Sequence, residues 1–365
     1  MLNQNWQIKE AKVSALKAVL IQPFRTALGE HQSLDNLLFT VKLTNNVVGY
    51  GEAAVATHIT GETVLGTERN LKAAAEWLAG KDLRDYLKIS HVLHDRWGKN
   101  PAMIAAVEMA LFDALAKKFH CPLWRFFGPR CRKLKSDITI VIADLPETES
   151  SIQKFYQQGF RSFKVKIGRD FDLDIKRVAA VWKIAQKSKI YLDANQGFSA
   201  DEMLKFLARL KRLRIRPDLL EQPVPRDDYE GLIKISKSTD IPVCADESVR
   251  SIPEAIHLIQ IKAVGVLNIK LMKFGMVHAY EIVKLAKIFG VRLMIGGMLE
   301  SSLAMTAAGH LAAGSEGFDY VDLDTPFFIQ DEAERHPYLS FNGVYDLRKV
   351  KEGIGVIPLN SEKTV

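Results

Sequence analysis

The chain contains 365 residues, of which 47% are hydrophobic and 25% are charged. These fractions are typical of globular proteins and exclude a disordered chain, a collagen-like chain and a small disulfide-stapled domain. The formal net charge is +7, but the 50 Lys and Arg residues are spread along the whole chain. Solvated helix faces therefore explain the charge better than a nucleic-acid-binding groove does.

Targeting signals and cysteine usage indicate where the protein works. Residues 1–17 contain no apolar signal-peptide region, and no apolar run reaches the ~18 residues of a membrane span. Cys121, Cys131 and Cys244 are an odd number of cysteines without CxxC spacing, which is typical of reduced thiols. We expect a cytoplasmic protein with neither a nucleic-acid partner nor a membrane partner.

The N-terminal third is predicted to be an α+β unit. Residues 13–51 read as short antiparallel strands, because apolar Phe39 and Val41 alternate with polar residues and Asn45-Asn46 marks a turn. Residues 62–78 and 101–119 show helical periodicity. The second of these helices is so apolar that it must be packed on several sides.

From residue 135 onwards, short apolar strands alternate with amphipathic helices. The predicted strands are residues 138–141, 162–167, 190–194, 219–221, 242–245, 266–270, 292–295 and 320–322. Eight strands at intervals of about 26 residues indicate a parallel α/β barrel. A doubly wound open sheet is the alternative, which is disfavoured because no Gly-x-Gly-x-x-Gly follows any strand.

Charged residues end five successive predicted strands. Lys164 and Lys166 are two residues apart, so both side chains face the barrel interior. The next strands end in Asp193, Glu221, Asp246 and Lys270. In a parallel barrel these carboxyl ends converge on the catalytic face.

The three acids are candidate metal ligands. Three hard oxygen ligands without a nearby Cys or His suit Mg²⁺. The alternative for each acid is that it caps the helix after its strand. Three such acids flanked by inward-facing lysines favour the metal site.

Lys166 and Lys270 are candidate proton carriers on opposite sides of that metal. Removal of the α-proton of a bound carboxylate gives an enediolate, and a lysine on each face describes a racemase or epimerase. Positive charge from Lys164 and the metal is expected to lower the pKa of a lysine base. The alternative for Lys270 is a structural salt bridge.

These residues resemble the enolase superfamily, in particular its muconate-lactonizing-enzyme subgroup. The matching pattern is Lys164-Val165-Lys166, Asp193, Glu221, Asp246 and Lys270. The resemblance implies a modified TIM barrel, (β/α)₇β, behind an N-terminal α+β capping domain. We accordingly divide the chain into a capping domain (1–132), a barrel (133–338) and a C-terminal segment returning to the capping domain (339–365).

A further motif separates the reactions of this subgroup, which include cycloisomerases, o-succinylbenzoate synthases, N-acylamino acid racemases and dipeptide epimerases. Asp322-Leu323-Asp324 resembles the Asp-x-Asp of dipeptide epimerases and would bind the substrate α-ammonium group. An Asx turn before Pro326 is the alternative. The same resemblance implies that Thr139, Lys164 and Met298 contact the substrate, and that Lys166 moves protons.

Two capping-domain loops, residues 23–29 and 56–61, are expected to cover the substrate side chain. By resemblance, Phe24 and Ile59 are candidate walls and Arg25 is a candidate contact. Ala-Glu epimerases of the family carry an arginine where this chain has Gly29. Because burying a glutamate carboxylate without a paired cation is costly, apolar or mixed side chains are predicted.

The combined hypothesis is a Mg²⁺-dependent dipeptide epimerase that inverts the C-terminal residue by 1,1-proton transfer. Its alternatives are an L-Ala-D/L-Glu epimerase of cell-wall peptide metabolism, an N-acylamino acid racemase, an o-succinylbenzoate synthase and a muconate-type cycloisomerase. A binding protein on a decayed barrel is disfavoured, because all five strand-end charges are present. The substrate partner is a small dipeptide, and homo-oligomer formation is left open.

Overall fold

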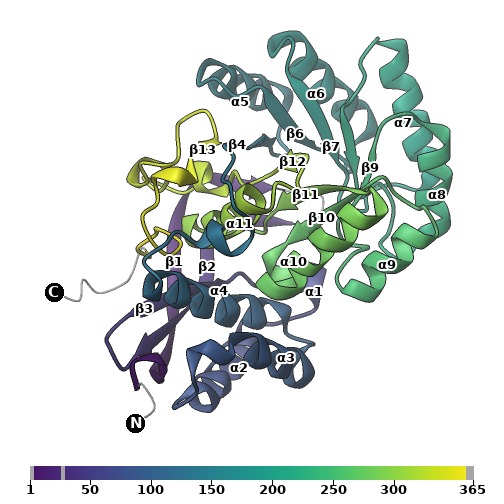
Figure 1. The fold of residues 1–365 in the computed structure, drawn as a ribbon. Helices are drawn as coiled ribbons and strands as arrows, with labels where there is room; N and C mark the ends of the chain where they lie inside the picture. Colours follow the sequence, from purple (N-terminus) through teal and green to yellow (C-terminus); the bar gives the residue numbers. More distant parts are fainter. Residues whose placement is uncertain (1–3, 26–28, 359–365) are drawn as a thin grey trace.

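The N-terminal part of the chain folds into a three-stranded antiparallel sheet packed against helices (Figure 1). The computed structural model describes residues 4–25 and 29–358. Strands β1 (Ile8–Arg25), β2 (Glu30–Leu43) and β3 (Val48–Ala53) pair in chain order. The predicted turn at Asn45-Asn46 lies between β2 and β3, and the apolar side chains of Phe39 and Val41 are fully buried.

Helix α4 is the core of this unit. The helices are α1 (Thr57–Thr60), α2 (Val64–Leu78), α3 (Tyr86–Trp97) and α4 (Pro101–Lys118), so both predicted helices are confirmed, and α1 and α3 were missed. Every residue of α4 from Ala102 to Ala116 is buried. Gly51 of β3 lies so close to α4 that a Cβ atom there would collide with the backbone of Ala106. The high apolar content of α4 therefore reflects packing on several sides.

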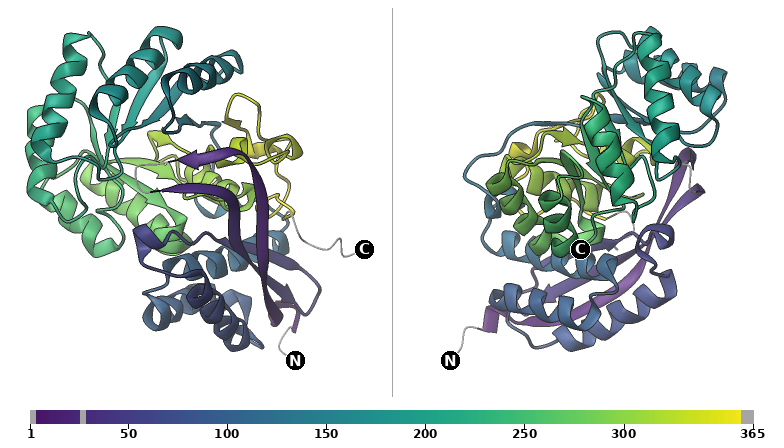
Figure 2. Two further views of the ribbon diagram at one scale, coloured as in Figure 1. Left: turned by 180° about the vertical axis from the view of Figure 1, so that it is seen from behind. Right: turned by 90° about the vertical axis from the view of Figure 1, so that its right-hand side faces the viewer.

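The rest of the chain forms an eight-stranded parallel barrel surrounded by helices (Figure 2). The strands are β5 (Ile138–Ile140), β6 (Ser162–Lys166), β7 (Lys189–Asp193), β8 (Leu219–Glu221), β9 (Val243–Ala245), β10 (Val266–Lys270), β11 (Arg292–Gly296) and β12 (Tyr320–Val321). The helices between them are α5 (Leu145–Gln157), α6 (Phe171–Ile184), α7 (Ala200–Arg212), α8 (Tyr229–Ser238), α9 (Ile252–Gln260), α10 (Leu271–Phe289) and α11 (Ser302–Ser315).

This element order confirms the predicted (β/α)₇β barrel. Each predicted strand agrees with an observed one to within one residue at either end. The strands pair in chain order from β5 to β12, and the backbone N–H of Asp137 donates to the carbonyl of Val321 across the two sheet ends (2.9 Å). The sheet is therefore curled round on itself, and the open-sheet alternative is excluded.

The β1–β2 hairpin reaches from the N-terminal unit onto the barrel, as the left view of Figure 2 shows. Leu20 forms an isolated β-bridge with Ile329, and the carbonyl of Arg25 accepts a hydrogen bond from the backbone N–H of Ile142 (3.2 Å). These contacts hold the end of β1 beside the first and last loops at the carboxyl ends of the barrel strands.

The C-terminal segment contacts both units. Strand β13 (Val344–Tyr345) pairs with β4 (Leu134–Lys135), which precedes the barrel. The backbone N–H of Ile354 donates to Asp113 of α4 (2.7 Å). Short 3₁₀ helices occupy Gln4–Trp6, Leu83–Asp85, Leu123–Phe126, Thr325–Phe328, Ala333–Arg335 and Leu347–Lys349. The domain boundaries at residues 132 and 338 stay predictions.

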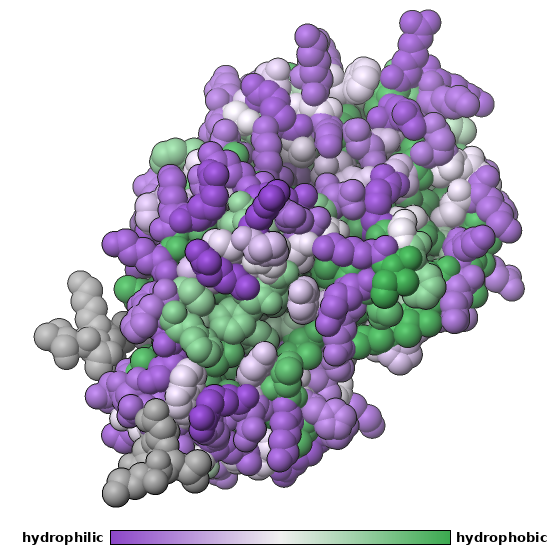
Figure 3. Space-filling view, in the orientation of Figure 1, coloured by the Kyte–Doolittle hydropathy of each residue, from purple (hydrophilic) through white to green (hydrophobic). Residues whose placement is uncertain are grey.

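Most of the face seen in Figure 3 is hydrophilic, and hydrophobic residues gather around α10. In the described part of the chain, no helix has both the length and the apolar character that crossing a membrane requires.

Candidate active site

A cavity of about 260 Å³ opens where the carboxyl ends of the barrel strands meet the capping elements. Nine of the predicted substrate and catalytic residues line it: Phe24, Ile59, Thr139, Lys164, Lys166, Lys270, Met298, Asp322 and Asp324. Asn195, which follows β7, also lines it and was not predicted. The structure therefore brings together residues that lie up to three hundred positions apart in the sequence.

Strand register explains why polar side chains from different strands meet. Lys164 is in register with Thr139 on one side, and Lys166 is in register with Asp193 on the other. Asp193 is in turn in register with Glu221. Because alternate residues of a strand face the same side, this register aligns the inward side chains in rows across the barrel.

Lys164 lies at the centre of the buried charges. Its Nζ is 2.7 Å from Asp322 Oδ2, 2.8 Å from Glu221 Oε2 and 3.0 Å from Asp193 Oδ2. Burial alone would lower the pKa of Lys164, but the carboxylates around it outweigh burial and raise this pKa well above its usual value. Lys164 therefore carries a fixed positive charge between the acids.

Lys166 and Lys270 face the cavity from opposite sides, because β6 and β10 are separated by three strands of the eight. Lys166 Nζ is 2.6 Å from Asp193 Oδ2, and Lys270 Nζ is 2.8 Å from Asp246 Oδ2. The ion pair considered as the alternative for Lys270 is thus present. Burial would lower the pKa of Lys270, but Asp246 outweighs it and raises this pKa, which differs from the expected lowering.

The predicted ligand trio is fully buried, and its acids differ in pKa. Burial raises the pKa of Asp193, but Lys164 and Lys166 outweigh it and lower this pKa to about 2. Burial, with Asp193 nearby, raises the pKa of Glu221 to about 7. Asp246 keeps a lowered pKa in spite of burial, because two ammonium groups flank it. The acids therefore raise one another's pKa values, whereas the ammonium groups beside them lower these values.

The trio fits a divalent cation by its chemistry, because it offers three hard carboxylate ligands. Glu221 Oε2 and Asp246 Oδ2 are buried, and each has a lysine ammonium group, Lys164 Nζ and Lys270 Nζ respectively, at 2.8 Å. Buried carboxylate oxygens need positive charge beside them, and hard cations such as Mg²⁺ bind oxygens of this kind. A tighter group of acids lies elsewhere: one carboxyl oxygen from each of Asp137, Asp322 and Asp324 lies within 4.8 Å of the other two.

Two residues that sequence reasoning missed orient the trio. Asn268 Nδ2 donates to Glu221 Oε1 (2.8 Å). Lys273 Nζ donates to Asp246 Oδ1 (2.7 Å) and to the carbonyl of Asn268 (2.9 Å). Lys273 follows the predicted lysine Lys270 by three positions, which is the only signal in the sequence that could have pointed to it.

Asp322 and Asp324 are held by the barrel and not by a local turn. Asp324 Oδ2 accepts the backbone N–H of Thr139 (2.6 Å), and Asp322 pairs with Lys164. Asp324 precedes the 3₁₀ helix Thr325–Phe328 but makes no side-chain cap to it. The turn-forming role considered as an alternative is therefore not observed.

A buried carboxylate of the N-terminal sheet fixes the loop that carries Met298. Glu52 of β3 accepts the backbone N–H of Ser301 (2.9 Å) and that of Ala304 (3.3 Å) at the start of α11. Asn36 of β2 donates to Glu52 (2.6 Å) and to the carbonyl of Leu299 (2.9 Å). The cavity wall thus depends on contacts between the two units.

The predicted specificity residues divide into two groups. Phe24 packs edge-to-face on Phe328, with ring centroids 5.3 Å apart, and Ile59 is buried in the cavity wall. Arg25 is instead paired with Glu30 (3.0 Å) and Glu147 (3.4 Å) and is not among the described residues that line the cavity. Residues 26–28 of the first loop lie outside the described residues.

A capped (β/α)₇β barrel with acids and lysines at its strand ends defines the class of enolase-type barrel proteins. Family models agree with this class: residues 9–128 match the N-terminal domain of mandelate racemase/muconate lactonizing enzyme, and residues 147–361 match the enolase C-terminal domain-like family. The chain belongs to the mandelate racemase/muconate lactonizing enzyme family of the enolase superfamily, as the sequence predicted.

Characterised relatives are similar over almost the full chain. A hydrophobic dipeptide epimerase of Citrifermentans bemidjiense is 45% identical, covering 97% of this chain and 98% of the relative. An L-Ala-D/L-Glu epimerase of Bacillus subtilis is 31% identical, covering 96% and 97%. The structure of a dipeptide epimerase from Enterococcus faecalis complexed with Mg and L-Leu-L-Tyr superposes with a TM-score of 0.90 at 30% identity, covering 96% and 99%.

Proposed function

We propose that this chain is a Mg²⁺-dependent dipeptide epimerase that inverts the α-carbon of the C-terminal residue of its substrate. The observation that carries the proposal is the placement of Lys166 and Lys270, which face one cavity from opposite sides of the barrel. The relatives named as dipeptide epimerases support the same reaction class.

The lysines exchange protons with the substrate in this proposal. Asp193, Glu221 and Asp246 would hold Mg²⁺, which when bound polarises a carboxylate and stabilises negative charge on its oxygens. The lysine on one face removes the α-proton, and the ammonium group of the lysine on the other face returns a proton to the same carbon. Lys164 keeps its charge and attracts the substrate carboxylate.

Asp322 and Asp324 bind the α-ammonium group of the substrate in the same proposal. Both acids line the cavity and are buried. An ammonium group gains charge-assisted hydrogen bonds from such oxygens. A substrate without an amine makes no such bonds with these acids, which favours dipeptides over N-acylated amino acids.

The substrate side chain is proposed to be apolar or mixed. The cavity wall contains Phe24, Val55, Ala56, Ile59 and Leu299. No arginine occurs among the described lining residues, and the lysines there are already paired with acids. His31 is the remaining described lining residue that can carry a positive charge. A glutamate side chain would therefore lose its hydration without gaining a permanently charged partner.

The test is incubation of the protein and Mg²⁺ with L-Ala-L-Xaa dipeptides in D₂O, with NMR detection of the C-terminal α-proton. We expect exchange and epimerisation for apolar Xaa, such as Leu or Phe. The variant Glu230→Gln, on an exposed position of α8, is the control for preparation and stability. Absence of exchange across a broad panel would overturn the proposal.

An L-Ala-D/L-Glu epimerase is the second candidate, because the relative of that name in Bacillus subtilis covers nearly the whole chain. The L-Ala-L-Glu arm of the same panel decides between them. Faster exchange with L-Ala-L-Glu than with L-Ala-L-Leu would favour this second candidate.

We also propose a cytoplasmic location. Cys121, Cys131 and Cys244 are free thiols, as expected in a reducing compartment. Cell fractionation tests the location, and sedimentation of the purified protein tests whether it forms a homo-oligomer.

A further inference from the structure

Asp137 is a buried acid that the proposed reaction does not use. It precedes β5 and faces the barrel interior like Thr139, which is two residues further along the chain. Its side chain is fully buried, and neither carboxyl oxygen has a hydrogen-bond partner among the described residues. One of its carboxyl oxygens nevertheless lies within 4.8 Å of an oxygen of Asp322 and an oxygen of Asp324.

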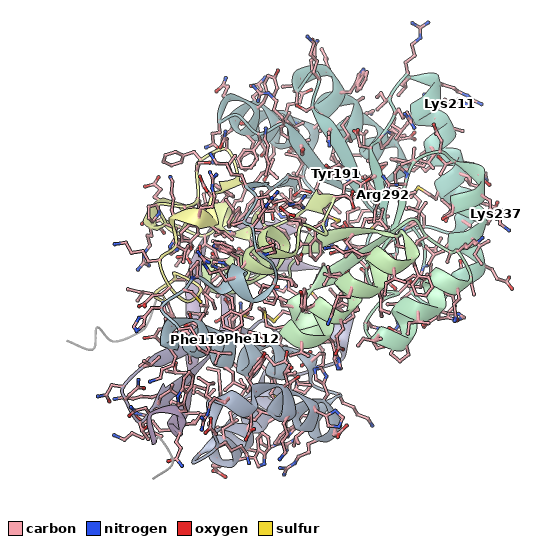
Figure 4. The ribbon with its side chains drawn as sticks, in the orientation of Figure 1. Phe112, Phe119, Tyr191, Lys211, Lys237 and Arg292 are labelled. Carbon is pink, nitrogen blue, oxygen red and sulfur yellow. The ribbon has the colours of Figure 1, made fainter. Side chains whose placement is uncertain are left out.

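The charges around Asp137 do not balance if all three acids are ionised. The positive charge of Lys164 favours the ionised form of Asp137. This ammonium group is, however, already paired with Asp193, Glu221 and Asp322. Towards the amino-terminal end of the barrel lies Tyr191 (Figure 4), whose phenol is kept neutral because burial raises its pKa. Three buried carboxylates near one shared ammonium group would repel one another strongly.

Protonation of Asp137 relieves this repulsion, and both burial and the two neighbouring acids favour its protonated form. Burial, together with Asp322 and Asp324, raises the pKa of Asp137 well above its usual value. Burial, together with Asp322, likewise raises the pKa of Asp324 to about 7. Two carboxylates cannot hydrogen-bond to each other, whereas a carboxylic acid donates its O–H to a carboxylate. A proton on Asp137 thus gives its orphaned oxygen a partner.

We propose that Asp137 is a positioning residue of the ammonium subsite, where its carboxylic acid donates a hydrogen bond to Asp322 and orients that carboxylate towards the cavity. Asp137 does not line the cavity, so it acts through Asp322. The shared proton also removes one negative charge from the subsite. This role rests on the proposed dipeptide function, because it concerns recognition of a free amine.

Two variants separate proton donation from a merely structural role. Asp137→Asn keeps an N–H donor of nearly the same shape, so KM and kcat for L-Ala-L-Leu should stay within about threefold of wild type. Asp137→Leu removes the donor, so KM should rise about tenfold or more while kcat stays within about threefold, as expected for one lost charge-assisted hydrogen bond. Equal KM increases in both variants, or no KM increase in Asp137→Leu, would overturn the proposal.

Infrared spectroscopy tests the proton without using activity. The difference spectrum between wild type and Asp137→Asn at pH 7 should contain the C=O stretch of one protonated carboxylic acid, and this band should shift in D₂O. A difference spectrum without this band would contradict the shared proton. Because this readout needs no substrate, it remains decisive even if the dipeptide function fails.

Discussion

Lys164 shows how one side chain organises the charges of the site. Its ammonium group lies within 3.0 Å of three carboxylates that come from β7, β8 and the loop after β12. A buried carboxylate that loses such a partner keeps its desolvation cost. The sequence predicted the inward direction of Lys164 from its spacing to Lys166, but not its three partners, because those depend on the register between strands.

Replacement of Asp322 tests the ammonium subsite at the residue scale. In Asp322→Asn the substrate amine loses a charged partner, so kcat/KM for L-Ala-L-Leu should fall by about 100-fold or more. Slow α-proton exchange of N-acetyl-leucine should change little, because that substrate has no ammonium group. An equal loss for both substrates would assign Asp322 a role unrelated to the amine, and full retention for the dipeptide would favour the cycloisomerase alternative.

Replacement of Asn268 tests how the metal ligands are oriented. In Asn268→Leu the Oε1 atom of Glu221 loses its donor, and loss of such a ligand-orienting bond lowers metal affinity by about 10–100-fold. Calorimetric titration with Mg²⁺ measures the change, with Asn45→Leu in the turn of the N-terminal sheet as the control. Unchanged Mg²⁺ affinity in Asn268→Leu would argue against Glu221 as a ligand.

Elements were predicted well where one pattern decides the structure. The barrel strands are short apolar runs bounded by polar residues, so their positions were predicted to within one residue. Helix α3 (Tyr86–Trp97) was missed although it has a buried face, because that face is short and contains only Ile89, Ser90 and Leu93 as buried residues. Asn268 and Lys273 were also missed, because their hydrogen bonds join residues that only the folded barrel brings together.

The packing of β3 on α4 gives a prediction at the element scale. A methyl group on Gly51 would collide with the backbone of Ala106, whereas one on Gly29 would meet no atom within 4 Å. Gly51→Ala should therefore lower the free energy of unfolding by about 2 kcal/mol or more through overpacking, and Gly29→Ala should leave it nearly unchanged. Urea denaturation measures both, and equal effects of the two substitutions would contradict the close approach.

At the scale of the whole molecule, the sequence indicated two units but not how they meet. The β1–β2 hairpin reaches the barrel through Leu20 and Arg25, and Glu52 fixes a barrel loop. Such contacts depend on side chains and backbone groups far apart in the chain, so no periodicity reveals them. Residues of both the N-terminal unit and the barrel line the cavity. Its apolar walls were therefore harder to predict than the charged residues at the ends of the barrel strands.

His310 joins three distant parts of the chain and makes stability depend on pH. Its Nδ1 accepts the backbone N–H of Trp124 (3.1 Å), so Nε2 carries the proton and donates to the carbonyl of Ile354 (3.0 Å). Burial lowers the pKa of His310 to about 4. Because the unfolded chain binds a proton near pH 6.5, this histidine stabilises the fold fully above pH 6.5, and the contribution is lost as pH falls towards 4.

The variant His310→Gln, which keeps a donor and an acceptor but does not titrate, isolates this contribution. Between pH 7 and pH 4 the free energy of unfolding of wild type should fall by about 3 kcal/mol more than that of the variant. Denaturant titrations at several pH values measure both. Parallel pH profiles would show that His310 is not held neutral in the fold.

The two-sided proton transfer is tested most directly by the separate variants Lys166→Ala and Lys270→Ala. Each is incubated with Mg²⁺ in D₂O, once with L-Ala-L-Phe and once with L-Ala-D-Phe, and the C-terminal α-proton is followed by NMR. Because the lysines face the cavity from opposite sides, neither variant should epimerise, and each should exchange the proton of only one isomer, a different isomer for each variant. Exchange of the same isomer by both variants, or epimerisation by either, would contradict the two-lysine mechanism.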